Sequence, residues 1–92
     1  MKLSAKIEYA SKAVLELALR YHGDQPVQMD TLSKAQNIPK KFLTQLLLRL
    51  KSSGIVNSSR GNAGGYFLAK APSEITLAQV FKAVDTQILS TP

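Results

Sequence analysis

The chain has 92 residues, of which 45% are apolar, enough for one small hydrophobic core in a single domain over residues 1–92. It contains no cysteine, which excludes disulfides, thiolate metal sites and thiol redox chemistry within these residues, and no apolar run approaches the roughly 18 residues of a membrane span. The net charge of +6 favours an anionic partner, and the lack of an apolar segment after the basic N-terminus predicts a cytoplasmic protein, associated with the nucleoid if that partner is DNA.

A first helix is predicted from Ser4, a candidate N-cap, to about residue 21. Its apolar residues recur at helical spacing: Ile7, Ala10, Val14, Leu17, Ala18 and Tyr21. Gly23 and Pro26 are expected to end it. A short second helix is predicted with Asp30 as its N-cap and one apolar face, formed by Leu32, Ala35 and Ile38.

A third helix is predicted over residues 39–53, because Pro39 suits a first helical position and Gly54 suits a left-handed residue after the helix. Its expected buried face consists of Phe42, Leu43, Leu46, Leu47 and Leu50. Residues 55–59 and 66–70 read as the two strands of a hairpin. Thr76 and Gln79 form a capping box for a last helix with the apolar stripe Leu77, Val80, Phe81 and Val84.

The order helix, helix, helix, hairpin, helix predicts a mainly α fold with a small β-hairpin, a winged helix-turn-helix. The excess positive charge is concentrated in the middle of the chain, because no Asp or Glu occurs from Thr31 to Ser73. That segment contains seven basic residues: Lys34, Lys40, Lys41, Arg49, Lys51, Arg60 and Lys70. A field of one sign suits nucleic acid first and an anionic membrane surface second, and the alternative is the ordinary solvated surface of a basic protein.

The outer face of the third helix carries Lys40, Lys41, Thr44, Gln45 and Arg49, with Lys51 near its end. Gln can pair with adenine, Lys with guanine, and Thr can donate, accept or contact a thymine methyl. The pattern therefore predicts a recognition helix in the major groove, with Lys34, Lys40 and Lys51 at phosphates. The alternative is the solvated polar face of an amphipathic helix.

The turn of the hairpin begins at Arg60 and contains Gly61, Gly64 and Gly65, which we expect to adopt positive φ and to approach a surface closely. An Arg at the tip of such a wing suits the negative potential of a narrow minor groove. A tight hairpin with a solvated Arg is the alternative. A phosphate-cradling loop is disfavoured, because such a loop runs from a strand into a helix and not between two strands.

No constellation of catalytic or metal-binding residues is apparent. His22 is the single histidine, and the six carboxylates are scattered. The sequence therefore predicts a protein that is not an enzyme, with no cofactor and no evident small-molecule ligand. The rival to DNA binding is a protein-interaction domain whose basic face binds an acidic partner protein.

Several segments resemble the Rrf-two family of IscR/NsrR/CymR-type regulators. They are residues 1–10, residues 38–50 with Phe-Leu-x-Gln-Leu-Leu, residues 75–85, and Gly54-Ile55-Val56 followed by Arg60-Gly61-x-x-Gly64-Gly65-Tyr66-x-Leu68-Ala69. The resemblance covers nearly the whole chain. It implies a homodimeric bacterial transcriptional regulator that binds palindromic promoter sites.

The resemblance also implies roles for single residues. Lys41, Thr44 and Gln45 correspond to the base-reading positions, Arg60 to the minor-groove arginine, and Ser4, Lys6 and Tyr9 to phosphate contacts at the start of the first helix. Two features depart from the family. Many members bind an iron–sulfur cluster through three cysteines that this chain lacks. Family chains usually continue into a long dimerisation helix, so a chain that ends at Pro92 is either truncated or a short paralogue.

Overall fold

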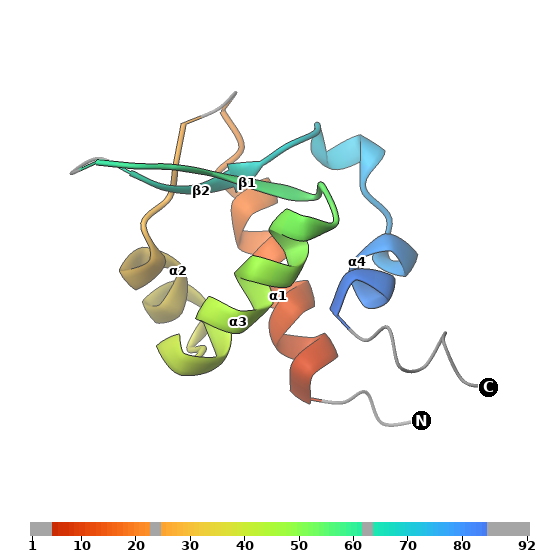
Figure 1. Ribbon diagram of the computed structural model, residues 1–92, viewed down its shortest axis with the longest axis horizontal. Coiled ribbons are helices and arrows are strands. Elements are labelled where there is room, and N and C mark those ends of the chain that lie inside the picture. The colour runs from red at the N-terminus through yellow and green to blue at the C-terminus, as the bar shows by residue number, and fades with distance from the viewer. Residues whose placement is uncertain (1–4, 23–24, 62–63, 85–92) are drawn as a thin grey trace.

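The computed structural model describes residues 5–22, 25–61 and 64–84. Its elements confirm the predicted order and the winged helix-turn-helix fold. They are α1 (Ala5–Leu19), α2 (Met29–Gln36), α3 (Lys40–Ser52), β1 (Val56–Ser59), β2 (Gly65–Leu68), a short 3₁₀ turn η1 (Pro72–Glu74) and α4 (Leu77–Val84). In Figure 1, α3 crosses in front of α1. Helices α2 and α4 lie on either side of this pair, and the hairpin runs along the top.

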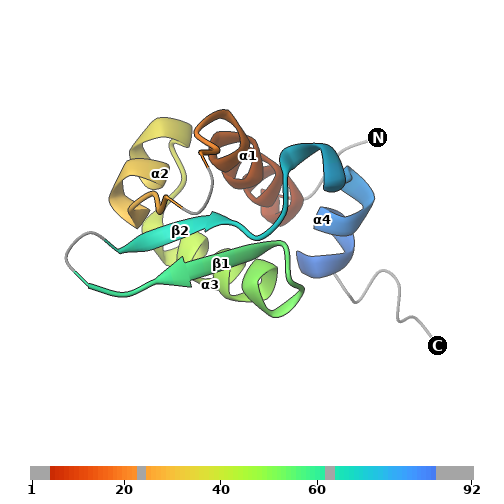
Figure 2. The same ribbon diagram turned by 90° about the horizontal axis from the view of Figure 1, so that it is seen from above.

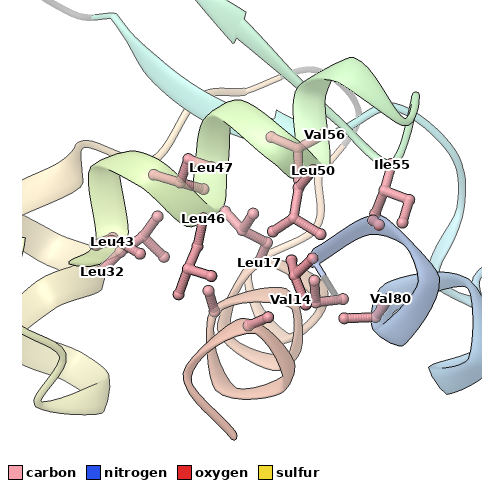
Figure 3. Close-up of a cluster of buried hydrophobic side chains, with 14 of the residues drawn as sticks. Val14, Leu17, Leu32, Leu43, Leu46, Leu47, Leu50, Ile55, Val56 and Val80 are labelled. Carbon is pink, nitrogen blue, oxygen red and sulfur yellow. The ribbon is translucent and has the colours of Figure 1, made fainter. Parts of the chain in front are cut away.

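The core lies between α1 and α3 and is closed by α4 and the hairpin (Figure 3). Helix α3 contributes four buried leucines at helical spacing, Leu43, Leu46, Leu47 and Leu50. They pack with Val14 and Leu17 of α1, Leu32 of α2, and residues of β1 and α4. Since each fully buried Leu contributes roughly 1.5–3 kcal/mol, this cluster holds α3 in place and leaves its opposite face exposed.

The turn between α2 and α3 is fixed by local hydrogen bonds. Asn37 adopts the left-handed conformation, with φ 53° and ψ 50°, and its N–H donates to the carbonyl of Ser33. The hydroxyl of Ser33 donates to the carbonyl of Ile38 at 2.6 Å. Ile38 is 1% exposed, so the turn is anchored in the core.

Two helix starts differ from prediction. Gln28, and not Asp30, precedes α2, and Asp30 lies in its first turn. Pro39 is the N-cap of α3 and not its first helical residue, because its ψ of 134° is extended. Its carbonyl nevertheless accepts the N–H of Leu43 at 3.0 Å, and so begins the helical hydrogen bonds. The predicted cap at Ser4 and the stop signal at Gly23 lie outside the described residues.

The hairpin pairs β1 with β2 antiparallel, with Val56 opposite Leu68 and Ser59 opposite Gly65. Strand β2 ends at Leu68 and not at residue 70, and the predicted first strand begins one residue later, at Val56. Tyr66 also forms two backbone hydrogen bonds with Val27, of 2.7 and 2.8 Å. The segment before α2 is therefore joined to the wing, as seen from above in Figure 2.

The positive φ predicted for the wing glycines is found at Gly61 and not at Gly64 or Gly65. Among the described glycines, only Gly54 (φ 81°) and Gly61 (φ 106°) have positive φ. Gly64 and Gly65 are required by close approach: a Cβ on Gly65 would lie 2.4 Å from the carbonyl oxygen of Val27, and one on Gly64 would lie 2.4 Å from that of Ser59. Thus two of the three glycines of the turn allow backbone segments to meet.

The capping box of α4 is confirmed, because the N–H of Thr76 donates to Gln79 Oε1 at 3.0 Å and the N–H of Gln79 donates to Thr76 Oγ1 at 3.1 Å. Four residues assigned to apolar faces are exposed instead, namely Tyr21, Ala35, Phe42 and Leu77. Tyr21 lies beyond the end of α1 and Leu77 is the first residue of α4, so both lie at helix ends that the core does not cover.

Among the carboxylates that the structure describes, only Glu16 is buried. Glu16, 9% exposed, accepts hydrogen bonds from Arg20 Nε at 2.5 Å and from Gln36 Nε2 at 2.7 Å, so it joins α1 to α2. The hydrogen bond from Arg20, then that from Gln36, lowers the pKa of Glu16 below its ordinary value of 4.5, against the smaller effect of burial.

In the described part of the chain, no helix is long and apolar enough to cross a membrane.

Candidate nucleic-acid interface

The outer face of α3 presents Lys41, Thr44 and Gln45, all exposed to solvent. The hydroxyl of Thr44 lies 2.8 Å from the carbonyl oxygen of Lys40 and 3.3 Å from the sulfur of Met29, and donates toward both. Its single proton is thus used within the protein, which leaves its methyl group and its acceptor capacity for a partner. Lys41 and Gln45 make no side-chain hydrogen bond or ion pair with any described residue.

Lys40, at the start of α3, is paired with an acid from α2. Its Nζ lies 2.6 Å from Asp30 Oδ1, and both side chains are more than half exposed. The hydrogen bond from Lys40, followed by the charges of Lys40 and Lys34, lowers the pKa of Asp30 below its ordinary value. Asp30 therefore compensates one of the basic residues of the acid-free segment, at the edge of the face predicted to meet DNA.

The two basic residues toward the end of α3 also contact the protein. Arg49 Nη1 donates to the carbonyl of Val84, the last described residue of α4, at 3.2 Å. Lys51 Nζ donates to the hydroxyl of Ser58 in β1 at 2.7 Å. Lys51, the expected phosphate ligand, thus connects α3 to the wing, and Arg49 connects α3 to α4.

The start of α1 lies beside the middle of α3, so two of the predicted phosphate contacts, Lys6 and Tyr9, are brought next to Gln45 and Arg49. These four residues line a hollow of about 270 Å³ together with Ala5, Phe42 and Leu46. The rings of Tyr9 and Phe42 are in contact, with centroids 5.9 Å apart and planes inclined by 33°. Phe42 is 48% exposed although its helical spacing predicts burial, so this contact with Tyr9 lies at the surface and not in the core.

Arg60 follows β1 directly and is exposed at the wing, next to the positive-φ Gly61. Its guanidinium has no hydrogen-bond or ion-pair partner within residues 5–22, 25–61 and 64–84. Lys34 is exposed in the last turn of α2. Ser4, the remaining predicted contact, lies outside the described residues.

Some features of this surface have no local signal in the sequence. Asp30 and Lys40 are ten positions apart, and Tyr9 and Phe42 are further apart still, so only the packing of the helices brings them together. Val27, which pairs with Tyr66, has no strand pattern around it. The acid-free segment is the strongest signal in the sequence, and it begins one residue after the acid that pairs with Lys40.

The residues do not fit a thiolate-bound iron site. The chain has no cysteine, and the described residues contain no group of three or more His, Asp or Glu that could hold a metal ion. The 92 residues therefore offer no thiolate ligand for an iron–sulfur cluster.

Comparison with known proteins gives a consistent picture. A family model described as Rrf2, "Iron-dependent Transcriptional regulator", matches residues 3–92. The HTH-type transcriptional regulator IscR of Photorhabdus laumondii is 42% identical over 91 residues, which are 99% of this chain and 55% of the relative. The chain thus spans little more than half of that relative's length.

Two solved structures resemble the fold closely. IscR of T. potens superimposes with a TM-score of 0.86 at 32% identity, over 92% of this chain and 61% of the other. CymR, the global cysteine regulator of B. subtilis, gives a TM-score of 0.85 at 30% identity, over 92% of this chain and 65% of the other.

Proposed function

Because the chain belongs to the Rrf2 family of transcriptional regulators, we propose that residues 1–92 form the DNA-binding domain of such a regulator and bind a palindromic promoter site as a homodimer. Relatives of this chain are named as regulators and not as enzymes. The observation that carries the proposal is the outer face of α3, where Lys41 and Gln45 extend from a helix held by four buried leucines and have no partner in the described chain.

In this proposal α3 enters the major groove, where Lys41, Thr44 and Gln45 meet base edges. Thr44 contributes its methyl group or an acceptor, because its proton is used within the protein. Arg60 enters the adjacent minor groove, and the glycines beside it let the wing backbone approach the duplex. Lys6, Tyr9 and Lys34 contact phosphates, together with Ser4.

Lys40, Arg49 and Lys51 have a second role in this scheme. Each contacts another element of the protein, namely α2, α4 and β1. They contribute positive charge near the phosphates and also hold the recognition helix in its orientation to its neighbours.

Selection of bound sequences from a random duplex pool tests the proposal. We expect an enriched palindrome with half-sites about 34–36 Å apart, or one helical turn. Titration of that site by fluorescence anisotropy at several salt concentrations should show affinity falling linearly on a log–log plot, with a slope of about −0.9 for each phosphate neutralised. A protein without affinity for any duplex at low salt would refute DNA binding, and retention of an acidic protein in its place would support the interaction-domain alternative.

A further inference from the structure

The hollow between α1 and α3 has a composition suited to a small organic anion. It has an aromatic side formed by Tyr9 and Phe42, and two cationic groups, Lys6 and Arg49, at its margin. None of the described residues that line it is acidic. Its volume of about 270 Å³ lies just below the roughly 300–1,000 Å³ of sites for drug-sized ligands, so it suits a single ring with a short arm.

The polar groups around the hollow have hydrogen-bonding capacity that no described residue uses. Lys6 Nζ, the hydroxyl of Tyr9 and the amide of Gln45 have no hydrogen-bond partner among the described residues. Arg49 uses Nη1 for the carbonyl of Val84, and its guanidinium has further N–H groups. A carboxylate can therefore accept charge-assisted hydrogen bonds at this margin, while an attached ring packs against Phe42, which is 48% exposed.

We propose that this hollow binds a small aromatic carboxylate, and that the bound carboxylate weakens DNA binding by occupying the α1–α3 face. The second half rests on the proposed function, because Lys6, Tyr9, Gln45 and Arg49 belong both to the hollow and to the proposed DNA interface. A carboxylate on Lys6 and Arg49 cancels positive charge and places a negative group where a phosphate would approach. Ligand and DNA therefore compete for the same side chains.

The first test measures ligand binding without DNA. The probe is 3-phenylpropionate, and the neutral 3-phenylpropionamide is its matched control; binding is followed in ¹H–¹⁵N spectra of the whole chain. We expect saturable shifts of the amides of Tyr9, Phe42 and Gln45 with a Kd below about 1 mM for the acid, and no saturation for the amide. Equal shifts with both compounds, or saturable shifts confined to other elements, would overturn the site.

Two variants separate charge from ring contact. Lys6→Gln should weaken binding of the acid by about five- to tenfold, through loss of a charge-assisted hydrogen bond. Lys12→Gln removes another exposed lysine of the same helix, which does not line the hollow, and should leave the Kd unchanged. Phe42→Leu keeps an apolar side chain and should weaken binding by loss of ring packing. Equal effects of the two lysine variants would reduce the site to general charge attraction and overturn it.

The second test adds a duplex obtained by selection. The acid should raise the apparent Kd for DNA in anisotropy titrations, and the amide at the same ionic strength should not. Ligand binding with unchanged DNA affinity would overturn the competitive half of the proposal. Ligand binding by a protein that binds no DNA would leave the site intact and refute the proposed function, so the two failures are distinguishable.

Discussion

The ammonium of Lys40 lies 2.6 Å from the carboxylate of Asp30, so the residue just before the acid-free segment neutralises the first residue of α3. The pair is exposed, and pairs of this kind contribute little to folding stability. The Asp30–Lys40 pair instead affects the electrostatic field of the proposed DNA face. An anion at this position reduces the attraction of α3 for phosphates.

Asp30→Asn should therefore increase DNA affinity. It releases Lys40 for a phosphate, and the slope of log affinity against log salt should become steeper by about one. Anisotropy titrations across salt concentrations measure the slope. Glu74→Gln is the control and should leave the slope unchanged, because Glu74 is an exposed acid of η1 that forms no ion pair with a described residue. A normal slope for Asp30→Asn combined with a reduced slope for Lys40→Ala would mean that Lys40 already binds a phosphate in the wild type.

Gln45→Ala and Lys34→Ala should weaken binding in different ways. Gln45 is proposed to read a base, so its removal should cost about 1–3 kcal/mol on the selected site and relax the preference at one base pair. Lys34 is proposed to contact a phosphate, so its removal should weaken binding to all sequences alike. A panel of single-base variants of the site measures both effects. If both variants change only general affinity, Gln45 does not read a base.

Arg60→Ala should lower affinity for the selected site while the circular dichroism spectrum and Tm stay unchanged, because Arg60 is exposed and has no partner in the described chain. Arg60→Lys keeps the charge but loses the planar guanidinium, and should recover only part of the affinity. Lys82→Ala removes a charge from α4 as a control. Equal losses for Arg60→Ala and Lys82→Ala would remove the wing from specific recognition.

Gly65→Ala should destabilise the fold by about 1–3 kcal/mol, as an overpacked position does. The added Cβ would lie 2.4 Å from the carbonyl oxygen of Val27, which must move away from its pairing with Tyr66. Urea unfolding measures the loss. Gly54→Asn is the control: Gly54 has φ 81° with open space around it, and Asn tolerates the left-handed region, so the cost should be smaller. Equal stability of wild type and Gly65→Ala would show that the Val27–wing contact can relax freely.

Glu16 should make the free energy of unfolding depend on pH in the acid range. Its hydrogen bonds from Arg20 and Gln36 lower its pKa in the folded chain below the ordinary value of 4.5. Its contribution to the free energy of unfolding is therefore present above pH 4.5, and is lost as the pH falls through the lowered pKa. Urea unfolding from pH 7 to pH 3 should show a steeper loss for wild type than for Glu16→Gln. Glu8→Gln, an exposed acid of the same helix, should retain the wild-type slope.

Much of the fold could be predicted from the sequence because its signals are local. Helical spacing of leucines identified α3, Gly54 marked its end, and Thr76 with Gln79 placed the start of α4 through bonds between residues three apart. The predictions failed where the packing of an element distant in the sequence determines whether a side chain is buried. Phe42 fits a buried helical stripe, yet it is half exposed: it lies outside the core and contacts the partly buried Tyr9 of α1 at the surface.

The glycines of the wing show the same division. Gly61 has the positive φ that a turn in any context would suggest, whereas Gly64 and Gly65 are required by backbone that approaches from elsewhere, in the case of Gly65 from Val27. Composition and periodicity depend on near neighbours along the chain, so they determined the elements, the basic segment and the absence of thiolate ligands. Which basic groups are paired, as Lys40 is with Asp30, depends on distances between helices, and only the tertiary structure decided it.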